Sequence, residues 1–209
     1  MFIHDIMTRE VVTVAPGSTL EDACRIMHDR NIRHLPVLEG DRLVGVVTDR
    51  DVHSATSALC LAPAPPRGLV GEAMSRPPRT ASPLDSIDEA ARTMRSAKIG
   101  CLPVLDGDQL VGIVTGIDLL DALLRMTGVD HPSGRLEVRL SGSSAELTRL
   151  VAFLGEGGLA LHSVLTYVER PEVVRTVLRV ATVDTRLAAR ALREAGFEVL
   201  WPPEKPWSP

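Results

Sequence analysis

The chain of 209 residues is long enough for two compact domains but too short for a large multidomain enzyme. Its hydrophobic content of 44% and charged content of 24% are typical of a globular protein, whereas an aromatic content of 3% provides few rings to stack on bases. The formal net charge of −4 gives no electrostatic attraction to polyanions, so we expect no nucleic-acid partner.

The first residues lack the basic start and apolar run of a signal peptide, and no stretch reaches the roughly 18 apolar residues of a membrane-spanning helix. We therefore expect a cytoplasmic protein with no membrane partner. The three cysteines, Cys24, Cys60 and Cys101, show no Cys-x-x-Cys spacing. The odd number of cysteines and the lack of this spacing predict reduced thiols and argue against both a disulfide framework and a zinc site.

An internal repeat organises the first part of the chain. Residues 6–52 align with residues 73–119 without a gap at an offset of 67, and about twenty of the forty-seven positions are identical. Each copy is predicted to have the order β-α-β-β-α. In the first copy, residues 18–21 form a capping-box pattern before apolar residues at helical spacing.

The predicted β-rich runs flank a turn that contains Gly, and a second helix follows from Asp49 or Gly116. The predicted strands are residues 11–14, 35–38 and 43–47 in the first copy and 78–81, 102–105 and 110–114 in the second. Between the copies, a Pro-rich segment at residues 62–68 cannot continue a helix and indicates a linker.

One sequence motif occurs at the same place in both copies. Residues 45–51 read Gly-Val-Val-Thr-Asp-Arg-Asp, and residues 112–118 read Gly-Ile-Val-Thr-Gly-Ile-Asp. A single Gly-x-x-Thr-x-x-Asp arises easily by chance, but two in register within a repeat are specific. Together with the order of elements, they resemble CBS domains, and the resemblance covers residues 1–127.

The motif has a physical reading as a ligand site. A strand that ends in Thr before a helix places a hydroxyl and free amide donors at a helix N-terminus, so Thr48 and Thr115 are candidate phosphate contacts. The carboxylates of Asp51 and Asp118 can accept hydrogen bonds from both hydroxyls of a ribose. The alternative is that these residues only cap helices. We favour ligand binding because both residues recur in both copies.

The resemblance to CBS pairs implies two clefts, each combining the Thr/Asp motif of one copy with strands of the other. The first pocket would contain Val12, Ile32, Arg33, His34, Thr115 and Asp118. The second pocket would contain Thr48, Arg50, Asp51, Arg79, Ile99 and Gly100.

We expect the first pocket to bind a nucleotide more tightly, because it has apolar walls and a cation, Arg33, for phosphate. In the second pocket, Gly100 replaces that cation and Arg79 replaces an apolar wall. A solvated Arg33 without a ligand is the alternative. His34 and Cys101 occupy equivalent positions, but two ligands are too few for a metal site, so we expect them to fill space.

The last third of the chain predicts the order β-α-β-β-α-β. The strands are expected at residues 136–140, 159–168, 173–183 and 197–201, with helices at 144–156 and 184–195. This order resembles an ACT domain, a ferredoxin-like module that senses amino acids and dimerises. Residues 141–144 keep the Gly of the family's first turn without its Pro, so dimerisation is the safer role. A CBS pair followed by such a domain resembles the arrangement in the acetoin utilization protein B family. Residues 1–8 also resemble the opening residues of that family.

These patterns predict an α/β (α+β) protein with three domains. The expected segments are a CBS domain at 1–56, a linker at 57–71, a CBS domain at 72–128, a linker at 129–134, an ACT-like domain at 135–203 and a tail at 204–209. The resemblance implies a regulatory protein that binds AMP, ADP, ATP or a related adenosine ligand and transmits the signal to a regulated partner or to the ACT-like domain. It also implies a homodimer.

Two other functions stay open: a dimerising scaffold with empty pockets, and an amino-acid sensor that works through the ACT-like domain. The sequence contains no convergent nucleophile–base pair, metal cluster or phosphate-transfer loop. We therefore expect neither an enzyme nor a catalytic cofactor.

Overall fold

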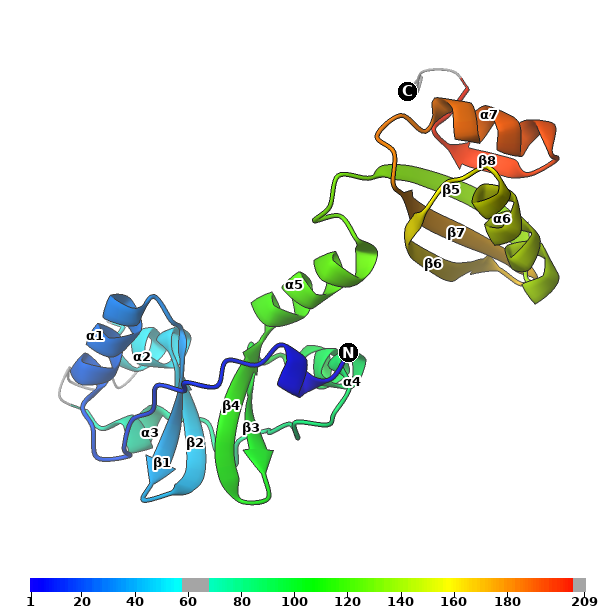
Figure 1. Cartoon of the computed structure of the whole chain (residues 1–209). Coiled ribbons are helices and arrows are strands. Elements are labelled where there is room, and N and C mark those ends of the chain that lie inside the picture. Colours follow the sequence, from blue (N-terminus) through cyan, green and yellow to red (C-terminus); the bar gives the residue numbers. More distant parts are fainter. Residues whose placement is uncertain (58–67, 205–209) are drawn as a thin grey trace. The chain divides into compact units, whose positions relative to one another are not determined.

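The computed structural model describes residues 1–57 and 68–204. The chain divides into two compact units, Met1–Ala122 and Leu123–Pro209 (Figure 1). Residues 58–67 of the predicted first linker and residues 205–209 of the predicted tail lie outside the described residues. Among the described residues, no helix has both the length and the apolar composition needed to cross a membrane.

The first unit contains the two copies of the repeat, and each copy builds a two-stranded antiparallel sheet with helices beside it. The first copy consists of α1 (Leu20–Arg30), β1 (His34–Glu39), β2 (Arg42–Thr48) and α2 (Asp49–Thr56). The second consists of α4 (Ile87–Ala97), β3 (Cys101–Asp106), β4 (Gln109–Thr115) and α5 (Gly116–Thr127). Two short helices, η1 (Ile3–Asp5) and α3 (Val70–Ala73), precede the copies. The predicted hairpins and the starts of α2 and α5 are confirmed.

Two local predictions differ from the structure. The predicted first strand of each copy is reduced to a single bridge, at Val14 and at Ala81. In the second copy, Pro77 and Pro78 have no amide proton to give to a strand.

The N-cap of α1 also lies one residue later than predicted. The side chain of Thr19, rather than that of Ser18, accepts a hydrogen bond from the amide of Asp22. Ser18 Oγ instead accepts from the amide of Ala15 at 3.3 Å, within the turn before the helix.

The segments that lead into the two copies are exchanged. Residues 1–8 place Ile3 and Met7 in the core of the second copy, whereas residues 68–75 place Val70 in the core of the first. Backbone hydrogen bonds hold the exchange: Thr8 and Ile113 bond each other twice at 2.9 Å. We call residues 1–8 and 68–75 the leading segments. Each copy therefore completes its core with the leading segment that precedes the other copy in the sequence.

The first Gly of each motif makes room for the exchanged segment. A Cβ on Gly112 would lie 2.6 Å from the sulfur of Met7, and a Cβ on Gly45 would lie 2.6 Å from the sulfur of Met74. The same motif position therefore packs against the equivalent methionine in both halves. This contact explains the Gly of the motif by packing, without any ligand.

We expect Gly112→Ala to lower the free energy of unfolding by about 1–3 kcal/mol, because the added methyl overpacks the contact with Met7 and the backbone oxygen of Thr8. Urea denaturation followed by circular dichroism would measure the change. Gly116→Ala is the matched control in the same copy, because nothing lies within 4 Å of its added methyl. Equal losses in both variants would contradict the packing explanation.

The second unit forms a four-stranded antiparallel sheet with two helices. Its elements are β5 (Gly134–Ser141), α6 (Ser144–Glu156), β6 (Leu161–Arg170), β7 (Val173–Val180), α7 (Arg186–Glu194) and β8 (Glu198–Trp201). The strand order is β6-β7-β5-β8, and α6 and α7 share one hydrophobic core with β5 and β7 (Figure 1). The predicted β-α-β-β-α-β order is confirmed, and it is the order of the ferredoxin-like motif.

Candidate functional site

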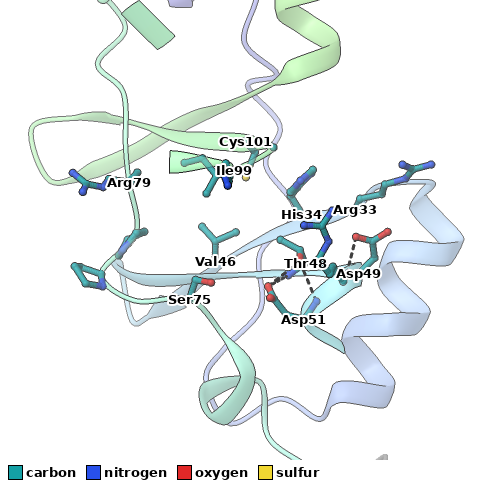
Figure 2. A pocket seen from close by; sticks show the side chains of 15 residues that line it. Arg33, His34, Val46, Thr48, Asp49, Asp51, Ser75, Arg79, Ile99 and Cys101 are labelled. Atoms are coloured by element: carbon teal, nitrogen blue, oxygen red, sulfur yellow. Dashed lines mark hydrogen bonds between the residues drawn. The ribbon is translucent and has the colours of Figure 1, made fainter. Parts of the chain in front are cut away.

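A cavity of about 370 Å³ lies between the two copies of the first unit. From the first copy it is lined by Arg33, His34 and the segment in which β2 passes into α2. From the second copy it is lined by residues near 75–79 and by the loop at 98–101 that leads into β3. Figure 2 shows Arg79 and Ile99 across the cavity from the Thr/Asp motif of the first copy.

The residues of the second predicted pocket all line this one cavity. They are Thr48, Arg50, Asp51, Arg79, Ile99 and Gly100. The first predicted pocket is divided. Arg33 and His34 line the same cavity as the second set, so they lie beside the motif of their own copy. The remaining four residues of that pocket, Val12, Ile32, Thr115 and Asp118, do not line it.

Those four residues have local roles that the structure makes visible. Val12 and Ile32 are half-buried and pack against the core of the first copy. Thr115 and Asp118 form a hydrogen-bonded pair at the start of α5: Asp118 Oδ2 accepts from the amide and the hydroxyl of Thr115, both at 2.7 Å.

Thr48 and Asp51 form the same pair in the lining of the cavity. Asp51 Oδ2 accepts hydrogen bonds from the Thr48 amide at 2.9 Å and from its hydroxyl at 2.8 Å, while Thr48 Oγ1 accepts from the Asp51 amide at 3.2 Å (Figure 2). This is a capping box, which satisfies amides that a helix start would leave without partners. All of these bonds to the carboxylate use Oδ2, so Asp51 Oδ1 can still accept from a ligand hydroxyl.

The amides at the start of α2 are not free, contrary to the expectation that they would meet phosphate. The amide of Asp49 donates to the carbonyl of Arg33 at 3.1 Å, and the amide of Arg50 donates to Asp49 Oδ1 at 2.8 Å. The hydroxyl proton of Thr48 is likewise committed to Asp51. Contact between Thr48 and a phosphate would break this cap, so cationic side chains are the better phosphate partners at this cavity.

Four cationic side chains line the cavity, two from each copy: Arg33, Arg50, Arg79 and Lys98. Two acidic side chains, Asp49 and Asp51, also line it. Lys98 and Asp49 were not among the predicted site residues. The signal for Lys98 was present, because it directly precedes Ile99, and the loop that carries Ile99 and Gly100 faces the cavity as a whole.

The imidazole of His34 lies close against the backbone of Gly100, and both residues line the cavity. A Cβ on Gly100 would lie 2.6 Å from Nε2 of His34, so only Gly leaves room for this imidazole. Burial lowers the pKa of His34 from its ordinary value of 6.5, and the nearby Asp49 partly opposes this. The neutral ring is therefore the favoured form in the folded protein.

Cys101 is a buried residue of the cavity lining and packs with Val46 and Ile113. Burial raises the pKa of its thiol to about 12, which keeps it protonated and a poor nucleophile. Among the described residues, no group of three or more His, Cys, Asp or Glu side chains is placed to hold a metal ion.

We expect the stability of the protein to fall as the pH drops below 6.5, because the unfolded chain binds the His34 proton more tightly than the folded chain does. Full stability is present above 6.5 and is lost as the pH falls toward the lowered pKa of the folded state. Unfolding free energies measured between about pH 5 and 8 should vary less in His34→Gln than in the wild type. A His34→Gln profile that follows the wild-type profile over this pH range would contradict the assignment.

The comparisons with known proteins agree with the repeat. The CBS domain family matches residues 3–57 and 70–125. The CBS domain-containing protein YhcV of Bacillus subtilis is 36% identical over 117 residues, which are 56% of this chain and 81% of that protein. An inosine-5'-monophosphate dehydrogenase of Korarchaeum cryptofilum is 34% identical over 147 residues, 70% of this chain. The alignment spans only 29% of that enzyme, and 23% of a matching homoserine O-acetyltransferase of Methanohalobium evestigatum.

Solved structures match the same part of the chain. The AcuB protein of Vibrio cholerae, described as an acetoin utilization protein, is 32% identical with a TM-score of 0.54, over 62% of this chain and 95% of that one. The CBS domain pair of protein MJ0100, solved with 5'-methylthioadenosine and S-adenosyl-L-methionine, is 26% identical with a TM-score of 0.54, over 63% and 98%. CBSX2, solved with AMP, is 26% identical with a TM-score of 0.54, over 60% and 97%.

Proposed function

The chain belongs to the CBS domain family, and from that premise we propose that it is a regulatory protein that binds AMP, ADP, ATP or a related adenosine ligand. The observation that carries the proposal is the cavity between the copies, which gathers all six residues of one predicted nucleotide pocket. Two similar CBS pairs were solved with adenosine ligands, one with AMP and one with 5'-methylthioadenosine and S-adenosyl-L-methionine. The cavity volume of about 370 Å³ is within the range of small-molecule sites.

The lining of the cavity suggests a role for each part of such a ligand. Asp51 Oδ1 accepts from the ribose hydroxyls, while Oδ2 stays bound to Thr48. Val46 and Ile99 supply apolar surface for the adenine, and the four cations of the lining meet phosphate. We assign the principal site to this cavity rather than to the set around Thr115 and Asp118, which reverses the ranking expected from the sequence.

The ligand would act by holding the two copies together. Because the cavity is lined by both copies, a ligand has different contacts in any state in which the copies shift apart, and only such a difference in affinity can change a conformational equilibrium. We assign the readout to a regulated partner protein or to the second unit. Its β-α-β-β-α-β order favours an ACT-like domain that joins two chains in a homodimer.

A ligand screen on the full chain tests the proposal. Thermal-shift measurements and calorimetry with AMP, ADP, ATP, NAD and S-adenosylmethionine should find at least one saturable ligand, and a ligand at about 100 times its Kd should stabilise the fold by about 2.7 kcal/mol. If none of these compounds binds, the regulatory proposal fails and the scaffold function is favoured. Amino acids belong in the same screen, because a response to one of them alone would favour an amino-acid sensor.

A further inference from the structure

Resting on the proposed function, we infer that this cavity selects adenosine ligands with two or more phosphate groups, as in ADP and ATP, and disfavours AMP, adenosine and the sulfonium cation S-adenosylmethionine. The inference starts from four cationic side chains, Arg33, Arg50, Arg79 and Lys98, which line one cavity from four different segments. They lie before β1, in α2, before the second copy's first helix and at the end of α4.

None of these four cations forms an ion pair with another residue in the part of the chain that the structure describes, and all four are exposed. Several arginines of the second unit are paired instead: ion pairs hold Arg135, Arg139, Arg175, Arg186, Arg190 and Arg193. The two acids of the cavity, Asp49 and Asp51, offset only part of this charge, because they face four cations. The cavity therefore has a local excess of positive charge in a chain whose net charge is −4.

The internal repeat supplies a comparison within the same chain. At the offset of 67, each of the four cations is replaced by an uncharged residue in the other copy. The equivalents of Arg33, Arg50, Arg79 and Lys98 are Gly100, Ile117, Val12 and Asn31. The offset of 67 assigns every residue of the cavity lining an equivalent in the other copy. Among these equivalents, Arg33 is the one arginine or lysine, and Glu10 and Asp118 are the acids. The excess of positive charge is thus a property of this cavity and is absent from the equivalent positions.

Lys98 gives an independent indication, because its backbone conformation is unfavourable for a lysine. It ends α4 in the left-handed region, at φ 55° and ψ 41°, where Asn31 ends α1 at φ 51° and ψ 43°. Asn adopts this region several-fold more readily than most residues that carry a Cβ. Lys98 stands where the repeat itself shows that Asn fits, and its side chain lines the cavity.

Several phosphates explain the number and spread of the cations better than one. One phosphate group is satisfied by one or two guanidinium groups, because a single guanidinium can already bind it through two hydrogen bonds. Four cations from both copies require a longer anion, and until it binds they repel one another across the cavity. A sulfonium ligand would add to that repulsion.

Calorimetry on the full chain tests the inference with adenosine, AMP, ADP, ATP and S-adenosylmethionine, together with GTP and inorganic tripolyphosphate. Three variants, Arg50→Ile, Arg79→Val and Lys98→Asn, each install the residue that the other copy carries. We expect ATP to bind about tenfold or more tightly than AMP, and each variant to weaken ATP binding by about tenfold while adenosine binding changes less than about twofold. Binding of ATP should also weaken at high ionic strength.

Two controls separate charge selection from other effects. Arg95→Ala removes an exposed cation of α4 that does not line the cavity, and it should leave ATP binding unchanged. Lys98→Asn should not lower Tm, because Asn suits the left-handed conformation, so weaker binding by this variant cannot come from misfolding.

The outcomes distinguish this inference from the proposed function. If adenosine, AMP and ATP bind equally and the three variants change nothing, the selection for several phosphates is wrong while the adenosine site stands. If GTP and tripolyphosphate bind as tightly as ATP and adenosine does not bind, the phosphate selection stands and the adenosine proposal fails. Equal weakening by Arg95→Ala would also overturn the inference, because it would trace the effect to net charge.

Discussion

Asp51→Ala weakens binding of the adenosine ligand by about 10- to 100-fold, the range expected when hydrogen bonds to a charged group are lost. Asp51 Oδ1 is the acceptor we assign to the ribose, and the substitution removes it together with the negative charge of the carboxylate. The measurement is a calorimetric titration of the full chain with the tightest ligand from the screen. The loss should appear in the dissociation constant.

Asp118→Ala is the matched control for this experiment. Both substitutions remove the same capping box at the start of a helix, at a cost of about 1 kcal/mol in stability, so their thermal shifts should be similar. Only Asp51→Ala should weaken binding at the cavity, because Asp118 does not line it. Binding that survives Asp51→Ala and is lost in Asp118→Ala would show that the ranking of the two halves is wrong.

Gly134→Ala destabilises the second unit by about 3 kcal/mol, at the upper end of what overpacking usually costs. Gly134 begins β5, and a Cβ built on it would lie 2.3 Å from the backbone oxygen of Thr182 and 2.3 Å from the methyl group of Thr185. A backbone carbonyl cannot rotate away as the end of a long side chain can. The strand start would have to move away from β7, with which Gly134 is paired through Val180.

Tryptophan fluorescence during urea denaturation measures this change in the second unit, because Trp201 lies in β8 and the other tryptophan of the sequence, Trp207, comes after it. Gly155→Ala in α6 is the matched control. Nothing lies within 4 Å of its added methyl, and Ala is favoured over Gly in a helix by up to about 1 kcal/mol, so this variant should be as stable as the wild type or more so. A loss in Gly155→Ala as large as in Gly134→Ala would refute the steric explanation.

Much of the fold could be predicted because the relevant signals are local. Helical spacing of apolar residues located α1 and α4, and alternation with Gly-containing turns located the hairpins. The order of the second unit followed from the same patterns, and predicted and observed strands differ mainly at their ends. Local patterns did not identify the N-cap of α1. Ser18 and Thr19 are both good caps, and only the path of the turn determines which hydroxyl accepts from the Asp22 amide.

The candidate site was harder to predict because it depends on contacts between the copies. The repeat shows that Arg33 and Gly100 are equivalent, but equivalence does not say which cleft either one faces. The sequence reasoning assigned Arg33 and His34 to the pocket of Thr115, whereas the structure places them in the cavity beside Thr48. The exchange of the leading segments was hidden for the same reason, because Met7 begins the first repeat in sequence and completes the second in space.

That exchange also constrains how the chain can be made. Ile3 and Met7 leave the ribosome well before Leu102, Val104 and Val114, with which they share a core and which are translated about a hundred residues later. Residues 1–8 must therefore keep their apolar side chains without their core partners until the second copy is nearly complete. Contacts so distant in sequence slow folding, so the time that this segment spends exposed is set by translation of the whole pair.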